Sequence, residues 1–325
     1  MTFVVAVAID PRIKFSFPMT NFKRATVSFA EIHRGGPARD GIPAIKNPKF
    51  VKVSDYNLHA LGDTEPVVQV VMAGEAIAYP IRMLMYHEIV NDVVAGVPIA
   101  VTYCPLCNSS MVFDRRVKGK TLTFGVSGLL RKSNLLMYDH QTESFWQQFI
   151  GEGVVGKYAG VALKWLPSNM VAFAEFKKNY PNGKVLIPKS YTARKYGTNP
   201  YRGYDLIKVP KFYQGGYKGP LPAKARLIVI EDEAWPEVMI RDQGTVYHGV
   251  YEFRYIEGQN SALDTYDIQK GRDVGNIYVR KRVGAEEYEP VVFHRSFAFA
   301  FKLFYPKGKI HGDLSQYTRK PVVDG

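Results

Sequence analysis

Short apolar runs alternate with turns along this chain, a pattern that predicts many brief strands and few helices. Residues 67–72 form a β-branched apolar run, and 76–79 return after a turn at Gly74. Further strands are expected at 98–103, 110–114, 122–126, 135–138, 227–231, 246–255 and 276–283. Many short strands with few helices predict a β-rich α+β fold with mostly antiparallel sheets.

Three segments have helical spacing instead. The apolar residues within 81–89 recur on one face at about 100° per residue, which predicts a helix there. A second helix is expected over 169–179, with Ser168 as its N-cap and Pro181 just after its end. A last helix is expected over 296–304.

Two helix ends share a sequence pattern that indicates an internal duplication. Residues 176–185 read FKKNYPNGKV and residues 301–310 read FKLFYPKGKI, so Phe, Lys, Tyr, Pro, Gly and Lys recur at an offset of 125. A weaker similarity links residues 75–80 with 233–236, at an offset of about 155–160. Because this offset is larger than 125 by about 30, the first half should contain about 30 more residues than the second half between its two repeated segments.

Composition and charge are those of a globular protein with a basic surface. Apolar residues make up 46% and charged residues 22% of the chain, an ordinary globular balance. The 43 Lys and Arg exceed the 30 Asp and Glu by 13, but they are scattered and accompany no specific nucleic-acid motif. No apolar run approaches the ~18–20 residues of a membrane span. The charge therefore indicates a basic surface, and the short apolar runs predict no transmembrane segment.

The repeat divides the chain into three parts. We expect an N-terminal extension with a Gly/Pro-rich loop over 1–66, a first half over 67–205 and a degenerate second half over 206–325. The apolar stretch at 3–9 has no positive segment before it and no small-residue cleavage site after it. A first strand is expected there rather than an export signal, and the compartment stays open.

Cys104 and Cys107 are the only cysteines, and their spacing makes them the first candidates for chemistry. Because they follow a predicted strand, both sulfurs can face one point, as a redox pair or as half of a metal site. Asn108 stands where a c-type haem site requires His, and strand rather than helix is expected next, unlike a thioredoxin arrangement. The alternative is two small buried thiols, or one short disulfide, without chemistry of their own.

Four further residues are candidates for the same site. His87 would be a third metal ligand, since two thiolates and one imidazole suit copper or zinc. Glu88 falls on the apolar face of the predicted helix, so we expect it to be buried and bonded to a polar partner. Alternatively, the helix ends near His87 and Glu88 binds backbone amides. Asp139 and Glu143 would be proton carriers or supporting groups, although Asp139 can also build a turn with Thr142.

Several motifs together resemble one family. They are HEIVND at 87–92, VTYCPLC at 101–107, FGVSGLL at 124–130 and DHQTESFW at 139–146. They are similar to motifs of a large prokaryotic family of unknown function, number thirty-one seventy-nine of that series. The resemblance covers residues 28–205 with specific motifs and extends loosely to 312. It implies a shared fold and no specific activity, and members of the family often look exported.

Three functions follow from these residues. The leading hypothesis is a metal-binding or redox protein in which His87, Cys104 and Cys107 hold copper or zinc, with Glu88, Asp139 and Glu143 in catalytic or supporting roles. The second is a metal-free thiol–disulfide protein. The third is a non-enzymatic binding module, in which the Tyr-rich segment 191–204 and the basic surface hold an anionic partner. The partner would be a small molecule or a metal ion in the first case, and the oligomeric state stays open.

Overall fold

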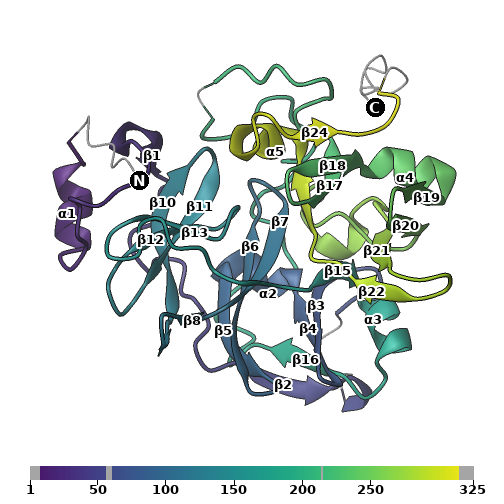
Figure 1. The fold of residues 1–325 in the computed structure, drawn as a ribbon. Coiled ribbons are helices and arrows are strands. Elements are labelled where there is room, and N and C mark those ends of the chain that lie inside the picture. Colours follow the sequence, from purple (N-terminus) through teal and green to yellow (C-terminus); the bar gives the residue numbers. More distant parts are fainter. Residues whose placement is uncertain (1–7, 56–60, 214, 315–325) are drawn as a thin grey trace.

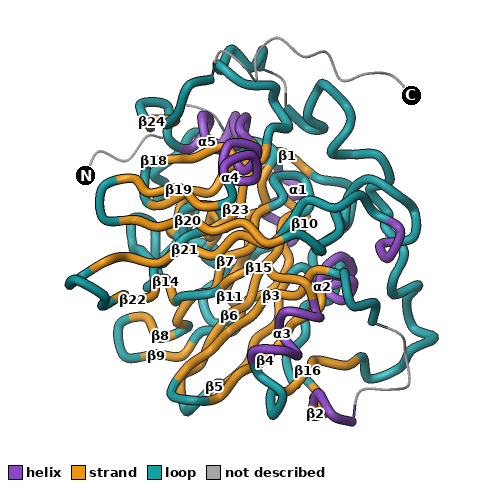
Figure 2. The backbone as a smooth tube through the Cα atoms, turned by 90° about the vertical axis from the view of Figure 1, so that its right-hand side faces the viewer, coloured by secondary structure: helices purple, strands orange, loops and turns teal. Residues whose placement is uncertain are grey.

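Strands dominate the computed structural model, which describes residues 8–55, 61–213 and 215–314. Figure 1 shows them in several twisted sheets, and Figure 2 shows the short helices at the ends of strands. Most strand pairs are antiparallel. This confirms the predicted β-rich α+β class.

The first half contains two sheets and two helices. One sheet has the strand order β15 (Asn169–Ala172), β3 (Pro66–Met72), β4 (Glu75–Pro80), β16 (Lys184–Ile187) and β2 (Lys49–Lys52). The other has the order β14 (Trp165–Leu166), β7 (Ser109–Asp114), β6 (Val97–Cys104) and β5 (Ile89–Val94). Helix α2 (Ile81–His87) follows β4, and α3 (Phe173–Asn179) follows β15.

The second half has the same plan. One sheet has the order β23 (His294–Phe297), β17 (Arg226–Ile230), β18 (Glu233–Pro236) and β24 (Lys309–Ile310). The other has the order β19 (Thr245–His248), β20 (Tyr251–Ile256), β21 (Asn276–Arg282) and β22 (Tyr288–Pro290). Helix α4 (Glu237–Gln243) follows β18, and α5 (Ala298–Phe304) follows β23.

Strand order and direction are the same in the two halves, as the expected duplication requires. In the first half, the hairpin of β3 and β4 pairs antiparallel with β15, which precedes α3, and parallel with β16, which follows α3. In the second half, the hairpin of β17 and β18 pairs in the same way with β23 before α5 and with β24 after it. The halves also pack against each other: β15 of the first half contacts β21 of the second, and β23 of the second half contacts β7 of the first. The amide N–H of Ala172 donates to Asn276 Oδ1, and that of Phe297, 125 residues later, donates to the Cys107 carbonyl. These reciprocal contacts indicate an approximate twofold relation between the halves.

An inserted sheet accounts for the extra residues of the first half. It has the order β1 (Ile32–Arg34), β10 (Phe124–Arg131), β11 (Asn134–Asp139), β12 (Phe145–Gln147) and β13 (Glu152–Val155). Its last four strands lie between β7 and β14, whereas only residues 283–287 separate the equivalent β21 and β22. The small ribbon of β8 (Arg116–Val117) and β9 (Lys120–Thr121) precedes them.

Three predicted elements need correction. The helices expected over 169–179 and 296–304 begin only at Phe173 and Ala298, because the preceding residues are strands β15 and β23. The strand expected over 246–255 is the hairpin of β19 and β20. The N-terminal segment also contains helix α1 (Pro11–Ser16), whereas the strand expected over 3–9 lies almost wholly outside the described residues. Single-turn 3-10 helices occur at Phe29–Glu31, Val53–Asp55 and Ile268–Lys270.

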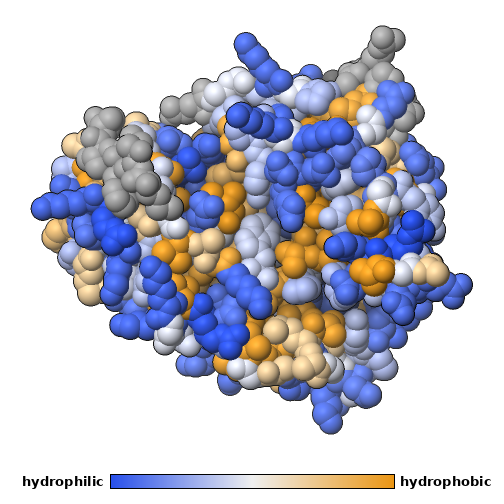
Figure 3. All heavy atoms as spheres, in the orientation of Figure 1, coloured by the Kyte–Doolittle hydropathy of each residue, from blue (hydrophilic) through white to orange (hydrophobic). Residues whose placement is uncertain are grey.

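Aromatic side chains fill the core, and polar ones cover the outside. Trp146 and Trp235 are both fully buried, one in each half. Figure 3 shows hydrophilic residues over much of one face, with smaller apolar patches between them. In the part of the chain that the structure describes, no helix is long and apolar enough to cross a membrane.

Candidate functional site

The two cysteines lie in a tight turn between β6 and β7. The amide N–H of Cys107 donates to the Cys104 carbonyl at 3.2 Å, and Asn108 adopts a φ of 50° to return the chain into β7. Other segments hold this turn: the Tyr204 hydroxyl donates to the Leu106 carbonyl at 3.0 Å. The predicted strand–CxxC–strand arrangement is therefore present, at a junction between the halves.

Both sulfurs are free thiols inside the protein. Cys104 is 2% exposed and Cys107 is 0% exposed. Burial alone would raise the pKa of Cys104, but the hydrogen bond from Cys107 and the N–H groups of Leu135, Cys107 and Leu106 outweigh it and lower the pKa. Burial and the neighbouring Cys104 sulfur raise the pKa of Cys107. The site is therefore asymmetric, with Cys104 the more acidic thiol.

A lysine completes the cluster from the segment that joins the halves. The Lys224 Nζ is buried, lies 3.1 Å from the centroid of the Tyr204 ring and has no hydrogen-bond partner among the described residues. Burial lowers the pKa of Lys224 to about 7, although the nearby Cys107 sulfur favours its charged form. At neutral pH this amine can hold or release a proton beside the thiols.

Glu88 approaches the thiols from the end of α2. It is 7% exposed, which confirms the predicted burial, and it ends the helix with a φ of 56°. Its carbonyl accepts from the Tyr103 amide at 2.8 Å. The expected polar partner of its carboxyl group is wrong, because within residues 8–55, 61–213 and 215–314 no hydrogen bond or ion pair reaches that group. Burial, with a smaller contribution from the Cys104 charge, raises the pKa of Glu88 to about 8. The carboxyl is therefore mostly protonated at neutral pH.

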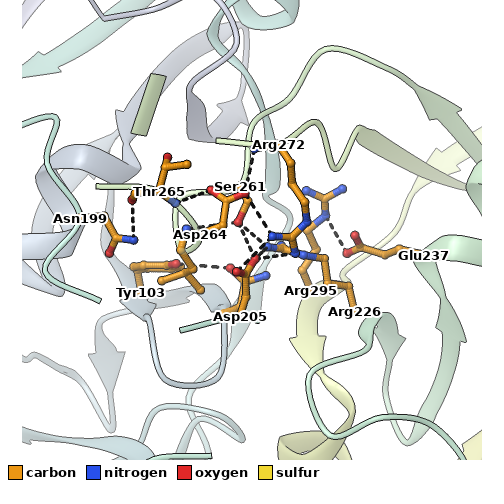
Figure 4. Close-up of polar contacts among 12 residues, drawn as sticks. Tyr103, Asn199, Asp205, Arg226, Glu237, Ser261, Asp264, Thr265, Arg272 and Arg295 are labelled. Carbon is orange, nitrogen blue, oxygen red and sulfur yellow. Dashed lines mark hydrogen bonds and ion pairs between the residues drawn. The ribbon is translucent and has the colours of Figure 1, made fainter. Parts of the chain in front are cut away.

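An ionic network continues from this cluster into the second half (Figure 4). Asp205 lies at its centre and accepts from Arg226 at 2.8 Å, from Arg272 at 2.7 Å and from Ser261 at 2.7 Å. Burial alone would raise the pKa of Asp205, but the two guanidinium groups outweigh it and lower the pKa. Figure 4 also shows the buried pair of Arg295 and Glu237, which are 3.0 Å apart.

His87 has partners outside the thiol cluster. Its Nδ1 lies 2.7 Å from the Pro43 carbonyl oxygen, and its Nε2 lies 2.8 Å from the Tyr196 hydroxyl. Burial lowers the pKa of His87. Among the described residues, no three His, Cys, Asp or Glu side chains gather as a metal-binding group. Both ring nitrogens of His87 are thus engaged elsewhere.

Asp139 and Glu143 lie together at the turn between β11 and β12. Asp139 accepts from the Thr142 amide at 2.6 Å and from Trp146 Nε1 at 2.9 Å, so it organises the turn. Glu143 pairs with Arg39 at 2.6 Å and accepts from the Met19 amide at 2.8 Å. Their polar partners come from this turn and the N-terminal segment.

Residues 39–308 match the sequence profile of a family described as "Protein of unknown function (DUF3179)". The chain belongs to this family. The match confirms the resemblance seen in the motifs and includes the second half, where those motifs are weak. No curated protein and no solved structure matches this DUF3179 chain.

Sequence patterns alone identified only part of this DUF3179 site. Cys104 and Cys107 share one turn, and Glu88 lies near enough for the Cys104 charge to raise its pKa, but Lys224 and Asp205 were missed. Both lie in the segment between the halves, more than 90 residues from Cys107, and no spacing rule links them to it. The one available signal was the Tyr-rich composition before Asp205, which indicates an ordered, packed loop.

Proposed function

We propose that Cys104 and Cys107 are the redox-active pair of a thiol–disulfide protein. One observation carries this proposal: two buried free thiols lie in one tight turn, which the hydrogen bond from the Cys107 amide to the Cys104 carbonyl closes, and their surroundings lower the pKa of Cys104. The Cys107 thiol itself donates to the Ser133 carbonyl at 3.4 Å. Backbone donors stabilise a thiolate without a permanent positive charge, and the second thiol is already in place to attack the first sulfur.

The reaction would be a two-electron exchange. The Cys104 thiolate attacks one sulfur of a disulfide substrate, forms a mixed disulfide and releases one substrate thiolate. Cys107 then gives up its proton and attacks the Cys104 sulfur, which releases the second substrate thiolate. The protein dithiol is oxidised to a disulfide, and the substrate disulfide is reduced to two thiols. Lys224 in its neutral form is the base that would take the Cys107 proton.

Burial of the sulfurs limits the substrate. Exposures of 2% and 0% leave no room for a folded protein's disulfide. A low-molecular-weight disulfide is the class that fits, with the Tyr204–Leu106 hydrogen bond as the contact that must open. This class also includes oxidants that convert a thiolate to sulfenic acid, which the second thiol resolves to the same disulfide.

Equilibration in glutathione buffers tests this proposal. The protein is incubated between about −150 and −300 mV, quenched with acid, unfolded and labelled with a thiol reagent. Two thiols should disappear together at one midpoint potential, and the Cys107→Ser variant should instead give a mixed disulfide with glutathione. A constant count of two thiols across this range rules the proposal out.

Metal binding is the second proposal, because the same two sulfurs form a soft donor pair that suits copper or zinc. His87 would be the third ligand if its contacts to Pro43 and Tyr196 opened. Metal analysis of the purified protein tests it: stoichiometric copper or zinc lost in Cys104→Ser supports the metal site, and loss in His87→Ala as well supports the three-ligand form. Thiols that neither oxidise nor bind metal would favour the third function, a binding module for an anionic partner.

A further inference from the structure

A second cavity lies away from the thiols, at the junction between the inserted sheet and the second half. Its volume is about 540 Å³, within the range of small-molecule sites. Its walls include Trp165 of β14, Tyr251 of β20, His294 of β23 and Tyr305 after α5. Glu152 of β13 in the inserted sheet also lines it, so four of the sheets described above contribute to one pocket.

The charge of this pocket is opposite to that of the chain. Glu152, Glu231 and Glu289 line it, whereas Lys281 is its one cationic lining residue. The three glutamates are exposed, and none forms an ion pair with another described residue. Lys281 lies directly opposite Glu289 in the register of β21 and β22, so it offsets one carboxylate. Two further carboxylates remain, Glu231 and Glu152, the latter near Arg131, in a chain whose formal charge is +13.

Aromatic rings stand close to these carboxylates. Burial, and then the charges of Glu152, Asp232 and Glu231, raise the pKa of Tyr305 to about 12. Burial and the charge of Glu231 also raise the pKa of Tyr251. Glu231 therefore lies near both tyrosines. Rings beside carboxylates are the surroundings that favour an organic cation, because the ring faces and the carboxylates are both negative.

A buried histidine also forms part of the pocket wall. His294 is 4% exposed and lines the pocket, and its Nε2 has no hydrogen-bond partner in the described part of the chain. Its ring packs edge-on against the Phe149 ring, with 5.1 Å between the ring centroids, and its centroid lies 5.5 Å from that of the Trp165 ring.

We propose that this pocket binds a small organic cation with an alkylated ammonium group. The carboxylates supply the charge complement, and the aromatic walls contact the alkyl substituents, which a hydrated inorganic cation lacks. This site does not depend on the dithiol chemistry, and its test does not involve the cysteines.

Choline is the probe, since it carries a quaternary ammonium group. Binding is measured by calorimetry and by tryptophan fluorescence, to which Trp165 contributes from the pocket wall while Trp146 and Trp235 are fully buried. We expect saturable binding, weakened about tenfold or more for the neutral isostere 3,3-dimethyl-1-butanol and for Trp165→Leu. Glu231→Gln should weaken it about threefold, because it removes one exposed carboxylate.

The matched control is Glu257→Gln, which neutralises an exposed glutamate outside the pocket and should leave choline binding unchanged. Since Glu231 is exposed, its variant tests the proposal even if Trp165→Leu does not fold. The proposal fails if choline shows no saturable binding up to on the order of 10 mM, a very weak affinity. It also fails if the neutral isostere binds equally well, or if spermidine binds and choline does not.

Discussion

At the scale of single residues, the site combines groups whose burial changes their protonation. Glu88 is held mostly neutral and Lys224 half-neutral, while backbone N–H groups favour the Cys104 thiolate. Sequence patterns could predict that Glu88 is buried, because its position on an apolar helix face is visible in the spacing. They could not predict that its carboxyl lacks a partner, since that depends on what the β6–β7 turn brings next to it.

The raised pKa of Glu88 makes a prediction about stability and pH. In the folded protein the pKa is about 8, whereas an unfolded Glu titrates near about 4.3. Between these values the unfolded chain loses its proton first, so wild-type stability should fall as the pH rises through this window. Glu88→Gln removes that loss, and its advantage over wild type should grow by up to about 4 kcal/mol between about pH 5 and pH 8.

Urea unfolding at both pH values measures this difference. Glu257→Gln is the control, because it changes an exposed carboxyl and should follow the wild-type pH dependence. If Glu88→Gln and wild type lose stability in parallel over this range, Glu88 is ionised in the folded protein and the argument from burial is wrong.

At the scale of elements, the strands could be predicted well, and so could the start of α2 at Ile81, but the starts of α3 and α5 could not. Each helix of the repeat, α2 to α5, begins without a side-chain cap, so the polar N-cap signal is missing from the sequence. For α3 and α5, the chain preceding the hairpin supplies an acceptor instead. The N–H of Phe173 donates to the Glu65 carbonyl at 2.9 Å, and the equivalent N–H of Ala298 donates to the Ala225 carbonyl at 2.9 Å. Such acceptors come from residues far away in sequence.

Asn276 provides a similar long-range partner and gives a second prediction. Its Oδ1 accepts from the Ala172 amide at 2.6 Å, just before α3, and its Nδ2 donates to the Ile256 carbonyl at 3.0 Å. Asn276 is fully buried, so Asn276→Ala would leave both partners unsatisfied. Unfolding free energy should fall by about 2–4 kcal/mol in denaturant titrations. Asn179→Ala is the control: its 3.4 Å contact to Tyr278 is exposed, and its effect should stay within about 0.5 kcal/mol.

At the scale of the whole molecule, two short echoes in the sequence predicted the duplication and the excess of residues in the first half. They did so because helix stops keep their Tyr-Pro and Gly-Lys residues even where the surrounding sequence differs. The reciprocal packing of β15 on β21 and of β23 on β7 left no trace in either echo. The path of residues 188–225, which bring Asp205 and Lys224 to the junction, could not be predicted from these repeated segments either. The predicted division at residue 205 falls within that connecting segment.

Asp205 ties the segment between the halves to the second half, next to Tyr204, which bonds to the β6–β7 turn of the first half. It is the subject of the last prediction. Its side chain is 0% exposed and pairs with Arg226 of β17 and with Arg272 of the loop before β21. Asp205→Asn removes the charge but keeps the size, which leaves the buried Arg226 without its counterion. Unfolding free energy at neutral pH should fall by about 3–5 kcal/mol, far more than for Asp242→Asn, which breaks the exposed pair with Arg241. Because Trp146 and Trp235 report from different halves, urea titration of single-tryptophan forms also shows whether the halves separate. We expect one shared transition in wild type and two midpoints in Asp205→Asn, and an unchanged, shared midpoint would mean that other contacts hold the halves together.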